Sequence, residues 1–221
     1  MHAYDKTYLD SAMDNLGTMI DCAVNHLGIP MERFYLQFLS SGIDREIEKG
    51  NPRFLAGMSG EELVWRVLDT EVIPLKKETY FVHYGPEYWV GWVLALLQWE
   101  TGLRFKDIQY GGMDVLTILS LYPTLHEADS AKFLDVAIAR MDTVRKSRPT
   151  RLKELRKAAG LTQQQLAARA GVSVRAVQSY EQRYLDISKA EVRAVSNMAE
   201  ALGCSVEELL YETRLAHHSA Q

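Results

Sequence analysis

The stretch LTQQQLAARAGVSVRAVQSYEQ, residues 161–182, contains two helix starts separated by one tight turn. Thr162 and Gln165 have the spacing of a capping box, in which each side chain accepts a hydrogen bond from a backbone N–H group of the first helical turn. Gly171 suits a sharp turn because glycine adopts positive φ angles without steric cost. Ser173 then predicts the start of the next helix. The stretch therefore predicts two short helices packed through a tight turn.

Three further helices are predicted around this pair. Their start and stop signals are Thr150 and Gly160, Ser188 with Glu191 and Gly203, and Ser205 with Glu208. Such caps matter because the first N–H groups of a helix have no partner within it, and one cap contributes about 1 kcal/mol. Five short helices with these signals predict a compact all-α domain over residues 150–212.

The apolar residues of this domain predict its core. The expected buried set is Leu152, Leu155, Leu161, Leu166, Val172, Val177, Tyr180, Val195, Met198, Leu202, Val206 and Leu209, with Ala167 as the small contact between two closely packed helices. The residues left to point outward from the third helix are Val174, Arg175, Gln178, Ser179 and Arg183. This outward set is the candidate functional surface.

Residues 152–210 resemble the helix-turn-helix domain of the Cro/CI (XRE) family of phage repressors and bacterial regulators. The resemblance rests on LRKAAGLTQQQLAARAGVS, VQSYEQ and LGCSVEELL, and it covers about a quarter of the chain. It implies a sequence-specific DNA-binding transcriptional regulator, and we expect a repressor. The recognition helix, Val174–Gln182, would enter the major groove. The implied partners are double-stranded DNA with a two-fold operator and a second copy of the chain, as a homodimer.

The residue types on the third helix suit base recognition. Arg175 can donate two hydrogen bonds to O6 and N7 of guanine, which discriminates between bases by roughly 1–3 kcal/mol. Val174 offers an apolar contact for a thymine methyl group, and Gln178 and Ser179 are adaptable polar groups. By resemblance, Val174, Arg175 and Ser179 fall where the family contacts bases. The family usually has longer polar residues at the positions of Val174 and Ser179, so the base sequence that is read stays open.

Phosphate contacts are expected beside the recognition helix. By resemblance, Gln163 falls where the family contacts a phosphate, and the exposed N–H groups at a helix start favour anions. Arg183 is expected to contact a second phosphate. The helix starts at Thr162 and Ser173 complete the predicted DNA-binding set. Glu181 is expected to be structural, because a carboxylate at the DNA surface would repel phosphate.

Charge divides the chain into two regions. Residues 1–148 contain 15 Lys and Arg against 21 Asp and Glu, a net charge of −6, whereas residues 149–221 contain 10 against 8, a net charge of +2. The charged segment 141–152 is the predicted boundary. We therefore expect a mostly helical partner- or effector-binding domain over residues 1–145, the DNA-binding domain after it, and a flexible tail over residues 213–221.

The front domain is expected to be built from helices. They are predicted over residues 9–27, over residues 31–42 with Gly42 at the end, after a capping box of Ser59 and Glu62, from Pro86 through the apolar run 88–99, and after a capping box of Thr124 and Glu127. Residues 49–60 are expected to form a loop, and residues 79–84 could form a short strand. The fold class is therefore all-α, with a helical N-terminal domain followed by the five-helix domain.

A stripe of Trp89, Trp92, Leu96 and Trp99 lies on one face of the predicted apolar helix. Such a stripe fits a buried core, for which Gly91 would permit the close approach of a neighbouring helix. It could instead line a ligand pocket, which would make the protein a ligand-sensing repressor. Both interpretations stay open.

Other functional classes lack a sequence signal. The two cysteines form no CxxC pair, the six histidines lack metal-ligand spacing, and no catalytic triad or phosphate-binding glycine loop is present. We therefore expect no enzyme activity, no cofactor and no metal. The longest apolar run is too short to span a bilayer, and scarce cysteine fits a reducing compartment. The expected location is the cytoplasm, without a membrane partner.

The front domain offers an alternative function. It loosely resembles domains joined to helix-turn-helix proteins of bacteria that are encoded beside small toxin-like partners. This resemblance implies an antitoxin that neutralises a protein partner through the N-terminal domain and autoregulates its operon. A helix-turn-helix used only for protein contacts, with Arg175 as a solvated surface charge, is the remaining alternative.

Overall fold

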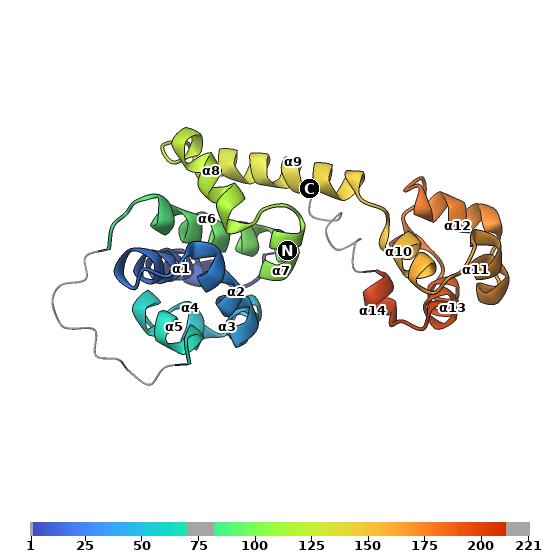
Figure 1. Ribbon diagram of the computed structural model, residues 1–221, viewed down its shortest axis with the longest axis horizontal. Coiled ribbons are helices and arrows are strands. Elements are labelled where there is room, and N and C mark those ends of the chain that lie inside the picture. Colours follow the sequence, from blue (N-terminus) through green and yellow to red (C-terminus); the bar gives the residue numbers. More distant parts are fainter. Residues whose placement is uncertain (1, 70–81, 211–221) are drawn as a thin grey trace. The chain divides into compact units, whose positions relative to one another are not determined.

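The computed structural model describes residues 2–69 and 82–210, and every regular element in these residues is a helix (Figure 1). The expected all-α class is confirmed. The chain divides into two compact units, Met1–Met141 and Asp142–Gln221. The expected tail and residues 79–81 of the possible strand lie outside the described residues, and residues 82–84 form no strand.

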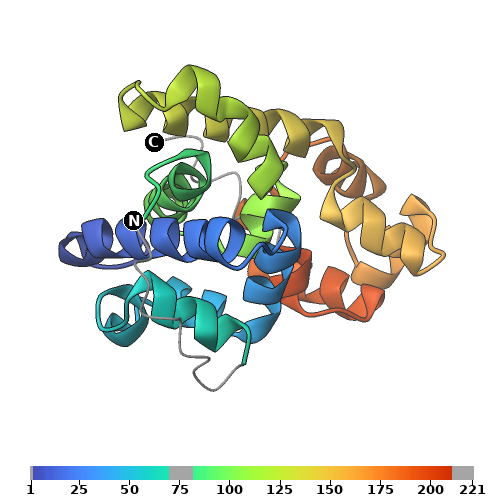
Figure 2. The same cartoon turned by 60° about the vertical axis from the view of Figure 1, so that its left-hand side comes forward.

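The first unit is a bundle of helices in which α1 packs most extensively against α6. Its elements are the 3₁₀ turn η1 (Lys6–Tyr8), α1 (Leu9–Asp21), the π-helical turn η2 (Cys22–His26), α2 (Met31–Ser41), α3 (Ile43–Glu48), α4 (Pro52–Leu55), α5 (Gly60–Val67), α6 (Pro86–Thr101), α7 (Phe105–Tyr110), α8 (Val115–Leu125) and the first part of α9 (Ser130–Ser147). Figures 1 and 2 both show α1 alongside α6.

Several predicted signals in this unit are confirmed. Ser59 and Glu62 form the reciprocal capping box that starts α5. Gly42 ends α2 with a φ of 88°, and Pro86 is the first residue of α6. The helix expected over residues 9–27 is α1 continued by η2.

Two predicted signals in this unit are wrong. Thr124 lies inside α8, where its hydroxyl donates to the Leu121 carbonyl at 3.1 Å, so it caps no helix. The next helix is α9, and Asp129 provides its cap by accepting a hydrogen bond from the Ala131 N–H at 2.9 Å. The loop expected over residues 49–60 contains α4, with Asn51 as its N-cap.

The charged segment 141–152, which was predicted as the boundary between the domains, is helical as far as Ser147.

The tryptophan stripe divides between two environments. Trp99 and Leu96 are each only 7% exposed, and the Trp99 indole N–H donates to the Tyr4 carbonyl at 2.9 Å. Trp89 and Trp92 are half-buried. The stripe is therefore core at its C-terminal end and partly open at its N-terminal end.

Gly91 allows the backbones of α1 and α6 to approach closely. A Cβ atom at this position would overlap the carbonyl group of Leu16 and the backbone nitrogen of Gly17 in α1. These are backbone atoms, so neither can rotate away. The close approach expected for Gly91 is present.

We predict that Gly91→Ala lowers the free energy of unfolding of the first unit by about 1–3 kcal/mol, the usual cost of overpacking. Helix propensity alone gives the opposite sign, because Ala is favoured over Gly in a helix by about 1 kcal/mol. Urea denaturation of the variant and the natural chain measures the difference. An increase in stability would contradict the proposed backbone contact.

Glu48 in α3 is a half-buried carboxylate that accepts a hydrogen bond from the Phe105 N–H at 2.8 Å. Burial raises the pKa of Glu48 to about 7; the Phe105 N–H opposes this rise and the neighbouring Asp44 carboxylate adds to it. Because the pKa is higher in the folded state than the ordinary value of 4.5, this group stabilises the fold fully below about pH 4.5. That contribution is lost as the pH rises through 7.

We predict that Glu48→Gln raises the melting temperature of the first unit by a few degrees at pH 8, and that the gain shrinks towards pH 5. Glutamine keeps an oxygen for the Phe105 N–H without the buried charge. Thermal unfolding followed between these pH values measures the effect. Glu46→Gln is the control, because Asn51 and Lys49 lower the pKa of Glu46, so its removal brings no gain at pH 8.

The second unit contains the five helices expected for residues 150–212 (Figure 2). They are α10 (Arg151–Ala158), α11 (Gln163–Ala170), α12 (Val174–Glu181), α13 (Val192–Leu202) and α14 (Val206–Leu209), with the 3₁₀ turn η3 (Ile187–Lys189) before α13. Most of the predicted core residues belong to one buried apolar cluster, in which Leu166, Val177 and Met198 are fully buried. The remaining five are only partly buried and pack against this cluster, namely Leu155, Val172, Tyr180, Leu202 and Val206. The predicted core is therefore confirmed for most of its members.

One helix start in this unit differs from the prediction. Ser188 lies in η3, where Asp186 accepts its N–H at 2.9 Å, and α13 begins after Glu191 without a side-chain cap. The expected stop is correct, since Gly203 ends α13 with a φ of 67°. The predicted box over Ser188 and Glu191 is therefore wrong.

Candidate nucleic-acid interface

The turn between α11 and α12 has the local geometry that its sequence predicts. The Thr162 N–H donates to the Gln165 Oε1 at 2.8 Å, and the Gln165 N–H donates to the Thr162 hydroxyl at 3.1 Å. Gly171 ends α11 with a φ of 65°. Ser173 caps α12 by accepting the Ala176 N–H at 3.1 Å. The start and end of each helix are thus set by short-range contacts.

A buried ion pair connects α10 to the C-terminal end of α12. Arg156 Nε lies 2.5 Å from Glu181 Oε1, and Arg156 Nη2 lies 3.0 Å from Glu181 Oε2. The Arg156 Nη1 also donates to the Leu161 carbonyl at 2.7 Å, immediately before α11. Arg156 is 9% exposed and Glu181 is 6% exposed. The pair therefore joins the three helices that form the helix-turn-helix and its support.

The pair also determines the charge state of its members. Burial raises the pKa of Glu181, but the hydrogen bonds from Arg156 and Gln163 and the positive charge of Arg156 outweigh it, so the pKa is lowered overall. The hydrogen bond to Glu181 raises the pKa of Arg156. Both groups are charged at neutral pH. The structural role expected for Glu181 agrees with these contacts, whereas Arg156 was not identified from the sequence.

The network continues from Glu181 to the protein surface. Gln163 Nε2 donates to Glu181 Oε2 at 2.9 Å, and Gln178 Nε2 donates to Gln163 Oε1 at 3.5 Å. Gln163 is half-buried and Gln178 is exposed. The carboxylate of Glu181 thereby orients the amide of Gln163, which in turn contacts the outward face of α12.

The expected base-reading residues differ in exposure. Arg175 and Gln178 are exposed, and Ser179 is half-buried. Val174 is also half-buried and packs against the apolar cluster, so its side chain is only partly outward. Thr162 and Ser173, at the two helix starts, are exposed. The structure thus brings most of the predicted set onto α12 and the beginnings of the two helices.

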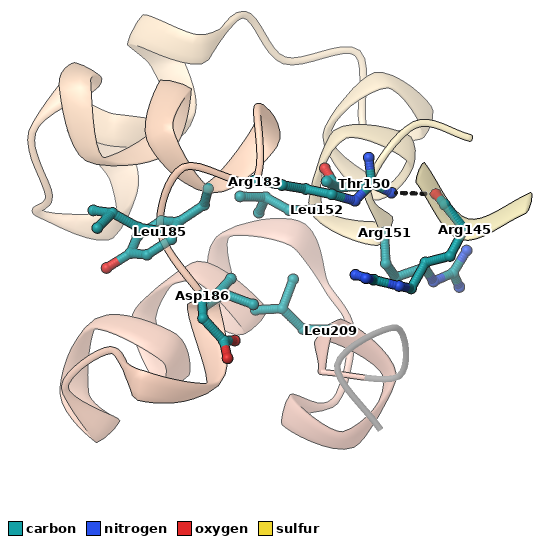
Figure 3. Close-up of a pocket in the computed structure, with 10 residues that line it drawn as sticks. Arg145, Thr150, Arg151, Leu152, Arg183, Leu185, Asp186 and Leu209 are labelled. Atoms are coloured by element: carbon teal, nitrogen blue, oxygen red, sulfur yellow. Dashed lines mark hydrogen bonds between the residues drawn. The ribbon is translucent and has the colours of Figure 1, made fainter. Parts of the chain in front are cut away.

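Arg183 lies apart from this set. It follows the end of α12, has a φ of 60°, and donates from Nη2 to the Arg145 carbonyl at 2.9 Å (Figure 3). It lines a small pocket of about 160 Å³ together with Arg145, Arg151 and Asp186. The sequence predicted that Arg183 points outward from α12, but its side chain instead turns towards the end of α9.

In the pocket beside Arg183, the positive charges of Arg145 and Arg151 are paired with carboxylates. Arg145 pairs with Asp142 at 2.5 Å. Arg151 pairs with Glu154 at 3.3 Å and with Glu208 at 2.6 Å. These carboxylates offset the arginine charges, so the pocket acts as a structural junction between the end of α9, α10 and α14.

Comparison with known proteins agrees with this geometry. Residues 152–209 match the family model described as helix-turn-helix. This part of the chain is a Cro/CI-type helix-turn-helix domain. The match supports a DNA-binding regulator of the XRE type. No curated protein and no solved structure matches the chain.

Within residues 2–69 and 82–210, no helix is long and apolar enough to cross a membrane. The same residues contain no group of three or more His, Cys, Asp and Glu side chains placed to hold a metal ion.

We predict that Glu181→Gln lowers the free energy of unfolding of the helix-turn-helix unit by about 3 kcal/mol, because it leaves the charge of Arg156 buried without its partner. Urea denaturation measures the loss. Replacing both residues, as Arg156→Met with Glu181→Leu, should recover most of it. Glu154→Gln is the control, since a partly exposed pair contributes at most about 1 kcal/mol. Equal losses for the two glutamine variants would contradict the role of the buried pair.

Proposed function

We propose that the protein is a sequence-specific transcriptional repressor that binds a two-fold operator as a homodimer, with α12 in the major groove. The observation that carries the proposal is the exposed Arg175 on a helix whose end is fixed by the buried Arg156–Glu181 pair. A recognition helix needs a fixed angle to the groove, and the ion pair supplies that constraint. The family match over residues 152–209 supports the same conclusion.

The proposed base contacts follow from side-chain chemistry and exposure. Arg175 donates to O6 and N7 of a guanine. Gln178, whose amide can both donate and accept, contacts the edge of an adenine or of another base. Ser179 supplies a shorter hydrogen bond beside them. Val174, which is half-buried, offers only the outer part of its side chain to a thymine methyl group. Arg175 is therefore the main source of discrimination in this proposal.

The proposed phosphate contacts flank α12. Thr162 and Ser173 lie at helix starts, where free N–H groups favour an anion. Gln163 Nε2 carries two hydrogens; one is donated to Glu181, and the other is directed to a phosphate in the complex. Arg183 follows the end of α12, where its Nη2 donates to the Arg145 carbonyl, and it is proposed as the second phosphate contact.

We predict that Arg175→Ala weakens binding to the selected operator by roughly 1–3 kcal/mol and relaxes the preference at one base pair. Gln163→Ala should instead weaken binding more evenly across sequences than Arg175→Ala does. Fluorescence anisotropy with the selected site and with single-base variants measures both effects. Arg169→Ala, which removes the same charge from the exposed end of α11, is the matched control.

An unbiased selection of DNA by the full chain tests the proposed function itself. The enriched sites should contain two half-sites about 34 Å apart, and the affinity should fall steeply with salt. If the selected pool shows no enrichment over random DNA, the protein is not a sequence-specific regulator. Binding of a single half-site by a monomer would exclude the homodimer.

The alternative of an antitoxin is supported by the surface of the first unit. Five of its large apolar side chains are exposed, namely Leu36 at 56%, Tyr84 at 78%, Tyr110 at 48%, Leu116 at 43% and Val136 at 37%. Where such groups form a contiguous patch, they mark a contact with another protein. Co-expression of the full chain with the product of the adjacent gene tests this function. Failure of the two proteins to co-purify would count against it.

A further inference from the structure

The first unit contains an open cleft that is lined mainly by aromatic rings. Its walls are formed by Tyr84, Tyr88, Trp89, Trp92, Tyr122 and Phe133, which come from the segment before α6, from α6, from α8 and from α9. Its volume is about 360 Å³, which falls in the usual range of small-molecule sites. The N-terminal end of the tryptophan stripe is therefore part of a cavity large enough for a ligand.

Three ring pairs of the cleft meet at steep angles, whereas Tyr122 and His126 stack at 20° with 4.4 Å between centroids. Trp89 lies at 76° to Tyr122, with 5.6 Å between ring centroids, and at 79° to Phe133, with 5.5 Å. Tyr84 lies at 71° to Tyr88, with 4.8 Å between centroids. A flat ligand stacks between two parallel rings, whereas perpendicular rings enclose a space that is similar in all directions. The cleft therefore suits a compact, rounded group.

The charges around the cleft favour a cation. Among the described residues that line it, none is Lys or Arg, and His126 is the basic side chain present. His126 Nδ1 donates to the Tyr122 carbonyl at 2.8 Å, and its Nε2 lies 3.6 Å from the Glu127 carboxylate. The Tyr88 hydroxyl donates to the Asp14 carboxylate at 2.8 Å. Acidic groups thus lie at two sides of the aromatic walls.

We propose that this cleft binds a small organic cation of the quaternary or methylated ammonium class. Such a group is compact, weakly hydrated and attracted to the faces of Trp and Tyr rings. The net charge of −6 over residues 1–148 adds a long-range attraction for cations. The proposal does not depend on DNA binding, because all the lining residues belong to the first unit.

Titration of the full chain with choline and with its neutral isostere, the dimethylbutanol in which carbon replaces the nitrogen, tests the proposal. Both probes have the same shape, so only the charge differs. Calorimetry and intrinsic tryptophan fluorescence should show choline binding at least about tenfold more tightly, as cation–π attraction requires. Equal or tighter binding of the alcohol, tighter binding of the flat probe indole, or no saturable signal with choline would each overturn it.

Two variants locate the site. Tyr84→Ala and Trp92→Leu each remove one aromatic wall and should weaken choline binding by roughly two- to thirtyfold. Tyr84 is 78% exposed, so its removal leaves the core intact. Tyr184→Ala is the matched control, because Tyr184 is also 78% exposed and lies in the second unit. Unchanged choline binding in both cleft variants, or an equal loss in the control, would overturn the assignment.

Discussion

The buried pair of Arg156 and Glu181 is the constraint on which the geometry of the helix-turn-helix depends. Each charge has been removed from water, so each requires the other. Arg156 satisfies both carboxylate oxygens and the Leu161 carbonyl at once. A planar guanidinium in such a fork permits little rotation. The orientation of α12 relative to α10 and to the start of α11 is therefore set by an electrostatic contact. Burial of the apolar cluster stabilises the packing of the helices against one another.

This arrangement couples the core of the domain to its outer face. Glu181 holds the Gln163 amide, and the Gln163 oxygen accepts the Gln178 N–H. Gln178 lies at the exposed end of this chain of contacts, with its amide 3.5 Å from the Gln163 oxygen, whereas the Gln163 amide is held by the buried carboxylate. Preorganisation of this kind reduces the entropy lost on binding. It also means that substitutions at Gln163 act on the proposed phosphate contact and on the recognition surface together.

Local signals allowed much of the fold to be predicted. Caps such as Thr162 with Gln165 and stops such as Gly171 depend on residues a few positions apart, and these were correct. The same spacing gave a wrong prediction at Thr124. A threonine inside a helix can donate to a carbonyl of the preceding turn instead of capping a new helix. The Arg156–Glu181 pair gave no local signal, since its members are 25 residues apart and charged residues are usually exposed. The position of Arg183 depends on the Arg145 carbonyl of another helix and was missed for the same reason.

Helix α6 shows how one sequence pattern can serve two physical purposes. Gly91 lets its backbone approach α1, and Leu96 and Trp99 on the same helix are buried. Trp89 and Trp92 lie on the stripe as well, yet they remain half-buried. Full burial of a large aromatic side chain stabilises a fold by roughly 1.5–3 kcal/mol, and a helix from elsewhere in the chain could have supplied it. The fold instead lines this end of α6 with further rings from α8 and α9. Open aromatic surface of this kind lowers solubility and forgoes stability, so its retention is better explained by a ligand than by packing.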